Sequence, residues 1–219
     1  MAARICVIDY QKGNLANVQR GLADAGFDTF ISSDAKDILA ADGLVLPGVG
    51  SFADAMVTMN ELGQSDAIRK KVAEGAPFMG ICLGMQLCLD WGDEGCPEGE
   101  RMEGLGLIRG HVERMPSLAA DDRKLKVPHV GWNSVRYTQP DSAFFSGIED
   151  DSYFYFTHSY ICVCDDERDV AGVTEHARPF ASAIQHDNLY LAQFHPEKSS
   201  DKGMRMLANF GRIVEGAQG

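Results

Sequence analysis

The sequence predicts an α/β fold, in which a mostly parallel, twisted central sheet has helices on both faces and an antiparallel strand region follows in the C-terminal half. Short apolar runs alternate with amphipathic segments in the N-terminal half, an order typical of parallel strands joined by helices. From Gly104 the pattern changes to closely spaced strands and turns. The 219 residues, 45% of them apolar, contain no Pro/Gly/Ser-rich linker, so we expect one domain over residues 1–219.

The N-terminal half supplies the parallel strands. Strands are expected at 4–9, 27–32, 43–47 and 76–81, and helices at 14–25, just before 43, between 51 and 74, and at 82–89. Strands covered on both faces are apolar almost throughout, as these runs are. Because the carboxyl ends of parallel strands meet at one edge, the strands at 43–47 and 76–81 should end at the same crevice.

The C-terminal half supplies further strands and a closing helix. Strands are expected at 106–114, 127–137, 152–163, 170–176 and 180–197, the last divided by a short hairpin connection at 186–188. The final helix, 199–216, has Ser199/Ser200 at its start as N-cap candidates. Met204, Leu207 and Phe210 share one face of this helix.

The charge of the chain excludes several classes of partner. Its net charge of −12 and pI near 4.8 disfavour a nucleic-acid groove or an anionic membrane surface. No apolar run approaches the roughly 18–20 residues of a membrane span, and the N-terminus has no signal-like segment. We therefore expect a cytoplasmic protein, and no feature of the sequence calls for a cofactor.

The six cysteines are too sparse for a disulfide scaffold. Cys6 is expected to face the core from a strand, Cys88 to pack within the helix at 82–89, and Cys96 to lie in a polar loop. Cys162 and Cys164 could suggest a metal, but no second pair of ligands stands at the required spacing, so strand alternation explains them better. We expect no metal site.

The sixth cysteine lies in "GICLGMQL", where an apolar strand meets a helix. A sharp strand-to-helix turn strains its corner residue and requires small neighbours two positions away, here Gly80 and Gly84. The corner also puts the thiol of Cys82 at a helix N-terminus, which favours the thiolate. By itself the motif fits a nucleophile and a small buried residue equally well.

A nucleophilic thiol needs a base and a group that orients the base. His195 follows a predicted strand, and Glu197 lies on the same side of extended chain, so its carboxylate can fix the imidazole tautomer. A surface turn is the alternative for an isolated His-Pro-Glu. His129, His158 and His176 lack a carboxylate two residues later and are expected to be structural, and Asp187 beside His186 points to the opposite face of a strand.

Backbone donors for an oxyanion are expected in "LVLPGVGSF". Gly48, Val49 and Gly50 can turn N–H groups into the crevice, and the N–H of Leu83 supplies a second donor. Phosphate binding is the alternative, but this loop lacks the lysine of a P-loop and the glycine spacing of a dinucleotide loop. Together with the cysteine and the histidine, the loop points to acyl transfer from an amide or ester.

With these motifs the chain resembles the class I, triad-type glutamine amidotransferases, whose flavodoxin-like fold has a Gly-x-Cys-x-Gly elbow and a late His-Pro-Glu. The further segments "GNLANV", "GLGLIRGHVER", "VPHVGWN", "FYFTHSY" and "FHPEKS" are similar to the glutaminase subunits of imidazole glycerol phosphate synthase. The chain departs from the pattern at Gln11–Lys12, where a glycine-rich turn is expected, and in the acidic loop at 90–103.

The resemblance implies that Cys82 attacks the side-chain amide of glutamine, that His195 protonates the leaving ammonia and activates water, and that Glu197 orients His195. It also implies that Gln86, Gly50, His158 and Ser159 hold the substrate. A local hydrogen bond within the helix is the alternative role for Gln86.

The implied partner is a (β/α)8-barrel cyclase, which takes the ammonia in histidine biosynthesis as the second subunit of a heterodimer. Candidate interface residues are Asn14, Trp132, Asn133, Tyr153, Tyr155 and Lys198. A peptide flip at Gly48–Val49, biased by the partner, would gate the oxyanion donors. The alternatives are a component of anthranilate, aminodeoxychorismate or pyridoxal phosphate synthesis, a non-catalytic relative, and a cysteine hydrolase of the same fold.

Overall fold

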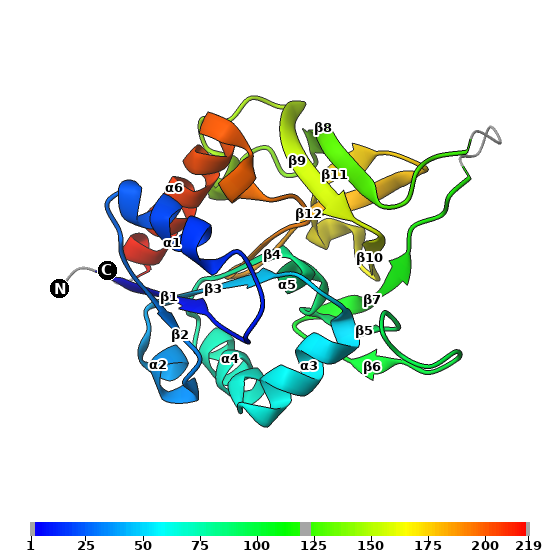
Figure 1. Cartoon of the computed structure of the whole chain (residues 1–219). Helices are drawn as coiled ribbons and strands as arrows, with labels where there is room; N and C mark the ends of the chain where they lie inside the picture. Colours follow the sequence, from blue (N-terminus) through cyan, green and yellow to red (C-terminus); the bar gives the residue numbers. More distant parts are fainter. Residues whose placement is uncertain (1–2, 119–123, 218–219) are drawn as a thin grey trace.

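The computed structural model describes residues 3–118 and 124–217 and confirms the α/β architecture (Figure 1). Five strands form the parallel part of the sheet, in the order β2 (Asp28–Ser32), β1 (Arg4–Ile8), β3 (Gly43–Gly48), β4 (Phe78–Cys82) and β13 (Leu189–Ala192). The last of these comes from the far end of the chain. Residues that follow β13 therefore lie next to the end of β4.

Helices cover both faces of the parallel strands, as β1 illustrates. Ile5 and Val7 pack into one apolar cluster with residues of α1 (Leu15–Asp24) and α6 (Ser200–Gly216). Cys6 and Ile8 pack into a second cluster with residues of α2 (Ala35–Ala40), α3 (Phe52–Glu61) and α4 (Gln64–Ala73). Figure 1 shows these two groups of helices on opposite sides of the sheet. Cys6 is a core residue, as predicted.

Further strands continue the sheet. Beyond β13 come β12 (Pro179–His186), β10 (Tyr160–Cys164), β7 (Ile108–Arg114), β5 (Leu89–Gly92) and β6 (Met102–Glu103). Their pairings are antiparallel except for that between β5 and β7, which is parallel. A branch from β12 contains β11 (Val170–Glu175), β8 (His129–Tyr137) and β9 (Ser152–His158). Single 3-10 turns lie at Ala143–Phe145, Glu167–Asp169 and Pro196–Lys198 (η3). Asp187 and Asn188 connect β12 to β13, which confirms the hairpin.

Two expected elements have different bounds in the structure. The helix expected at 82–89 is only α5 (Leu83–Gln86), because the carbonyls of Leu87 and Cys88 accept bonds from the N–H groups of Leu105 and Leu107, both at 2.8 Å. The strand expected at 152–163 is divided at Ser159, because β9 pairs with β8 while β10 pairs with β7 and β12.

No helix in the described parts of the chain is long and apolar enough to cross a membrane.

Candidate active site

Cys82 stands at the corner where β4 turns into α5. Its backbone has φ 55° and ψ −111°, a conformation that costs free energy for a residue with a side chain. A Cβ on Gly84 would lie 1.8 Å from the carbonyl oxygen of Leu46, and one on Gly80 would lie 2.7 Å from the carbonyl oxygen of Gly84. The two glycines are therefore required by close backbone contact, and the cysteine itself carries the strain.

His195 and Glu197 form a buried pair just beyond β13. Nδ1 of His195 is 2.9 Å from Oε1 of Glu197, and the two side chains are 3% and 1% exposed. Burial by itself lowers the pKa of His195, but its interactions with Cys82 and Glu197 outweigh burial and raise this pKa to about 9. The backbone N–H of His195 donates to the carbonyl of Tyr155 at 2.9 Å.

Ser199 holds the backbone of His195 in place through its hydroxyl group. It occupies the position before α6, but its hydroxyl makes no bond to the helix. Instead the hydroxyl donates to the carbonyl of His195 at 2.6 Å and accepts from the N–H of Tyr155 at 3.0 Å. The expected capping serine therefore fixes His195 to β9.

The thiol of Cys82 is engaged with groups other than the imidazole. It donates to the carbonyl of Thr157 over 3.8 Å and accepts from Nε2 of Gln193 over 3.6 Å. Among the described residues, Nε2 of His195 and Oε2 of Glu197 are buried and have no hydrogen-bond partner. A free imidazole nitrogen close to a thiol is the arrangement that proton transfer between them requires.

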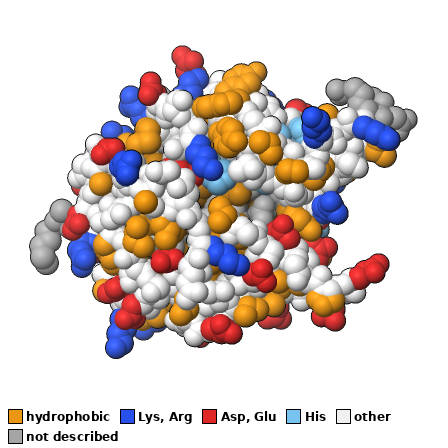
Figure 2. All heavy atoms as spheres, in the orientation of Figure 1, with side chains coloured by type: hydrophobic (Ala, Val, Ile, Leu, Met, Phe, Trp, Pro, Cys, Tyr) orange, Lys and Arg blue, Asp and Glu red, His pale blue; other side chains and the backbone are white. Residues whose placement is uncertain are grey.

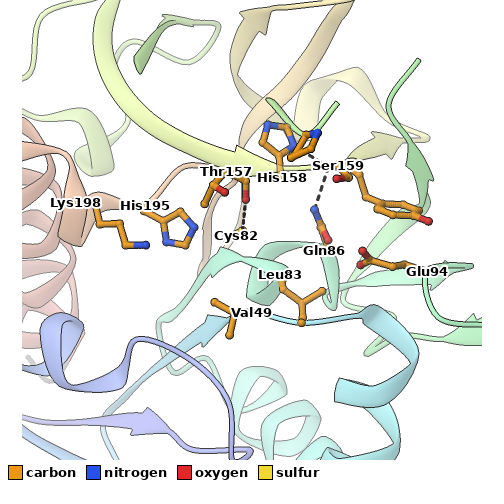
Figure 3. A pocket seen from close by; sticks show the side chains of 13 residues that line it. Val49, Cys82, Leu83, Gln86, Glu94, Thr157, His158, Ser159, His195 and Lys198 are labelled. Carbon is orange, nitrogen blue, oxygen red and sulfur yellow. Dashed lines mark hydrogen bonds between the residues drawn. The ribbon is translucent and has the colours of Figure 1, made fainter. Parts of the chain in front are cut away.

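A cavity of about 300 Å³ opens above the thiol. Figure 3 shows His195 and Lys198 on one side of Cys82, Gln86 and Glu94 on the other, and Val49 and Leu83 below. The residues predicted for the site that line the cavity are Val49, Gly50, Cys82, Leu83, Gln86, His158, Ser159, His195 and Lys198. Gly48 and Glu197 are outside this lining: Gly48 pairs with Cys82 in the sheet, and Glu197 bonds to His195.

The Val49 peptide does not offer its N–H to the cavity. That N–H donates to the hydroxyl of Tyr10 at 2.9 Å, and the same hydroxyl donates to the carbonyl of Val49 at 3.1 Å. Tyr10 is fully buried, and burial raises the pKa of its hydroxyl, which stays protonated. Next to it, Gln11 takes φ 69° where a glycine-rich turn is typical. The oxyanion role of Val49 stays a prediction and requires the bond to Tyr10 to break.

Gln86 is held by side-chain and backbone partners at the base of the cavity. Its amide nitrogen donates to the carbonyl of Tyr160 at 3.1 Å and to Oε1 of Gln193 at 2.9 Å. Gln193 is fully buried and touches the thiol as well. Gln193 was not among the site residues predicted from the sequence, although its alternation with His195 at the end of a strand was an available signal.

Glu94, which follows β5 and lines the cavity, was also not predicted from the sequence. Burial raises the pKa of this carboxyl group. The loop at 90–103 gave no signal for its role, because its acidic residues look alike in the sequence. The carboxylate of Glu94 is available at the end of the cavity opposite His195 (Figure 3).

Among the interface candidates, Lys198 lines the cavity. Trp132 is 51% exposed and Tyr153 is 59% exposed, and Trp132 stands opposite Tyr155 across β8 and β9. Lys198 lies 5.9 Å from the ring centroid of Tyr155. Figure 2 shows a hollow near the centre of the view that contains a histidine, with hydrophobic side chains beside it.

Asn14 and Asn133, the other two candidates, are partly buried. The amide of Asn14 donates to Oε1 of Glu197 at 3.3 Å, so it touches the buried pair directly. The amide of Asn133 donates to the carbonyl of Glu175 at 2.8 Å.

The chain is similar in sequence to known proteins. The model of the family "Glutamine amidotransferase class-I" matches residues 6–214. The "Imidazole glycerol phosphate synthase subunit HisH" of Moorella thermoacetica is 45% identical over 97% of this chain and 96% of its own length. The protein of the same name from Sulfurimonas denitrificans is 45% identical over 94% of this chain and 96% of its own.

Solved structures show the same fold at low identity. PurLQS from Thermotoga maritima aligns with a TM-score of 0.73 and 17% identity over all of both chains. A glutamine amidotransferase from the same organism aligns with a TM-score of 0.62 and 14% identity over all of this chain and 86% of its own. The chain belongs to the class I glutamine amidotransferases and, among them, to the family of imidazole glycerol phosphate synthase HisH subunits.

Proposed function

We propose that this chain, acting as one glutamine amidotransferase domain in the cytoplasm, hydrolyses L-glutamine to glutamate and ammonia. The ammonia passes to a (β/α)8-barrel cyclase, which makes imidazole glycerol phosphate and aminoimidazole-carboxamide ribonucleotide in histidine biosynthesis. The observation that carries the proposal is the strained Cys82 at the floor of a cavity whose wall includes His195, which is bonded to the buried Glu197.

The reaction proceeds in two halves. The thiolate of Cys82 attacks the side-chain amide carbon of glutamine, and the N–H groups of Leu83 and Val49 stabilise the oxyanion. His195 gives its proton to the nitrogen as the C–N bond breaks, which releases ammonia and leaves a thioester. Water then loses a proton to His195 and attacks the thioester, and glutamate leaves as the thiol is restored.

Glu197 supports both halves because it holds Nδ1 of His195, which leaves Nε2 to exchange the proton. The cavity of about 300 Å³ fits a small amino acid. Glu94, at the end opposite His195, is available for the ammonium group of the substrate.

The cyclase would bind the face made by Trp132, Tyr153 and Tyr155 and form a heterodimer. Exposed aromatic side chains such as these are enriched in protein interfaces. Lys198 and the mouth of the cavity adjoin this face, so the ammonia can leave the site into the partner. Direct transfer prevents the loss of ammonia to protonation and diffusion.

Binding of the partner would also make the N–H of Val49 available to the oxyanion. In the chain alone the N–H of Val49 is bound by Tyr10. A flip of the Gly48–Val49 peptide turns that N–H toward Cys82, and binding of the cyclase favours the flipped form. The lone chain should therefore be a slow glutaminase.

The test measures glutamine hydrolysis by the chain alone and with a histidine-pathway cyclase, with Cys82→Ala as the control. We expect stimulation by the cyclase and no hydrolysis by the variant. The complex with Cys82→Ala should still make imidazole glycerol phosphate from added ammonia, because the cyclase site is on the other chain. Hydrolysis by Cys82→Ala would disprove the mechanism, and a mixture without stimulation would disprove the choice of partner.

A further inference from the structure

Two buried histidines lie side by side at the cavity, one on β8, which also carries Trp132, and one on β9. His129 begins β8 and His158 ends β9, and the two are directly opposite in the antiparallel register. They are 5% and 6% exposed, and His158 lines the cavity. The ring of His129 stacks on Phe156, with 4.9 Å between ring centroids, and on His176, with 4.2 Å. Packing thus fixes the plane of His129.

The hydrogen bonds assign a tautomer to each ring. Nδ1 of His158 is 2.8 Å from the carbonyl oxygen of Tyr160, which can only accept, so Nδ1 carries the proton. Nε2 of His158 must then accept from Nδ1 of His129 at 3.0 Å. Nε2 of His129 in turn accepts from the amide of Asn133 at 3.3 Å. Both nitrogens of each ring are engaged.

The assignment requires both rings to be neutral, and their surroundings keep them so. Burial, and then the neighbouring His176, lower the pKa of His129 to about 4. Burial also lowers the pKa of His158, to about 3, against the bond to Tyr160, which raises it. At neutral pH neither ring carries a charge, and His158 has no free nitrogen for a ligand.

The chain of bonds continues from His158 to the thiol. The carbonyl of Tyr160 accepts from His158 and also from Gln86. Gln86 donates to Gln193, and Gln193 donates to Cys82. A continuous network of buried polar groups therefore joins Asn133 on β8 to the sulfur. Such networks orient their members jointly, because each bond fixes the direction of the next.

We propose that His129 is a positioning residue for Cys82. Its Nδ1–H donates to Nε2 of His158, so the proton of His158 stays on Nδ1 and is donated to the carbonyl of Tyr160. That carbonyl also accepts from Gln86, which donates to Gln193. The network thereby sets the direction in which the amide of Gln193 donates to the thiol of Cys82. The proposal rests on the proposed glutaminase function and changes the expected role of His158, whose ring supports the backbone of the cavity wall rather than a substrate atom.

His129→Phe tests the proposal, because phenylalanine keeps the stacking on Phe156 and removes both nitrogens. His129→Asn is the rescue variant, since its amide can donate from near the position of Nδ1. His176→Phe is the matched control: His176 also stacks on His129, but its own bond is to the carbonyl of Lys126. Thermal unfolding of each variant identifies any loss of folding.

Three measurements are made on the wild type and the variants. One is kcat and KM for glutamine with the cyclase. The second is the rate at which iodoacetamide alkylates Cys82, followed by mass spectrometry of its peptide. The third is the ring 15N shifts of His158, which distinguish a protonated nitrogen from a proton-free one.

For His129→Phe we expect roughly a 10-fold lower kcat with KM within about twofold, and roughly fivefold slower alkylation of Cys82. The 15N shifts should change from one tautomer of His158 to a mixture. His129→Asn should recover most of each effect, and His176→Phe should match the wild type.

The proposal is wrong if folded His129→Phe keeps the wild-type tautomer and alkylation rate, or if only its KM changes. Should His129→Phe fail to fold, His129→Asn decides: a wild-type tautomer and alkylation rate support the proposal, and mixed tautomers with unchanged alkylation overturn it. If wild-type chain and cyclase hydrolyse no glutamine, the proposed function fails, whereas alkylation and 15N shifts still decide the role of His129.

Discussion

Replacement of Tyr10 by phenylalanine should raise the glutaminase activity of the chain without its partner. The hydroxyl of Tyr10 binds both the N–H and the carbonyl of Val49, and it is the group that keeps this N–H from the cavity. Tyr10→Phe removes that hydroxyl and keeps the buried ring. The arrangement with the N–H turned away from Cys82 then loses its polar partner, whereas the flipped arrangement loses nothing.

The size of the effect follows from the two bonds. A typical hydrogen bond contributes about 1 kcal/mol net, and a buried donor left without a partner costs about 1–3 kcal/mol. We therefore expect the inactive arrangement to lose about 1.5 kcal/mol relative to the active one. This corresponds to roughly a 10-fold larger active population, because about 1.4 kcal/mol is a factor of ten.

The assay is glutamate release by the isolated chain at saturating glutamine. Tyr10→Phe should be about 10-fold faster than the wild type alone and nearly equal to it with the cyclase, where the N–H is already free. Tyr137→Phe is the control, since Tyr137 is a buried tyrosine at the end of β8, outside the cavity lining. A folded Tyr10→Phe that is as slow as the wild type, or slower, would refute the reasoning.

Three further predictions concern stability and binding. Because the folded-state pKa of His195 is about 9, above the ordinary 6.5, its stabilising contribution is present below pH 6.5 and is lost as the pH rises through 9. Urea unfolding should show this loss, on the order of 3 kcal/mol, and Glu197→Gln should make it smaller. Gly84→Ala should lower the free energy of unfolding by about 3 kcal/mol or more, since the new Cβ meets the carbonyl of Leu46. Circular dichroism in urea measures this free energy. Gly75→Ala, whose Cβ meets no atom within 4 Å, should lower it by less. Trp132→Ala should weaken binding to the cyclase roughly 30-fold by calorimetry and leave thermal unfolding unchanged, whereas equal affinity would place the interface elsewhere.

The corner at Cys82 and the parallel strands could be predicted because their signals are local. Apolar runs identify buried strands, and the glycines two positions from Cys82 have a steric cause that depends on few other residues. His195 and Glu197 were predictable for the same reason, since their separation in the chain decides whether they can touch. These features can be recognised from residues close in the sequence, although the carbonyl that Gly84 meets belongs to Leu46 on β3.

The features that were missed depend on distant neighbours. Tyr10 meets Val49, and Gln193 meets Cys82, only because the sheet brings their strands together. The short extent of α5 has a similar origin, since N–H groups of Leu105 and Leu107 bind the carbonyls that a longer helix would use. Periodicity within the segment itself contains no information about such partners.

The arrangement of the strands explains how a partner can act on this site without moving the nucleophile. The corner at Cys82 is fixed by close contacts of Gly84 with the backbone of Leu46 on β3 and of Gly80 with the backbone of Gly84, so little displacement is possible there. β9, by contrast, belongs to a branch of the sheet, and it reaches the site through two carbonyls: that of Thr157 accepts from the thiol, and that of Tyr155 accepts from the N–H of His195. The same strand presents Tyr153 to solvent. A partner bound on its outer face would therefore act on the thiol and the base together, and we expect a small shift of β9 to release the thiol toward His195 while β4 stays in place.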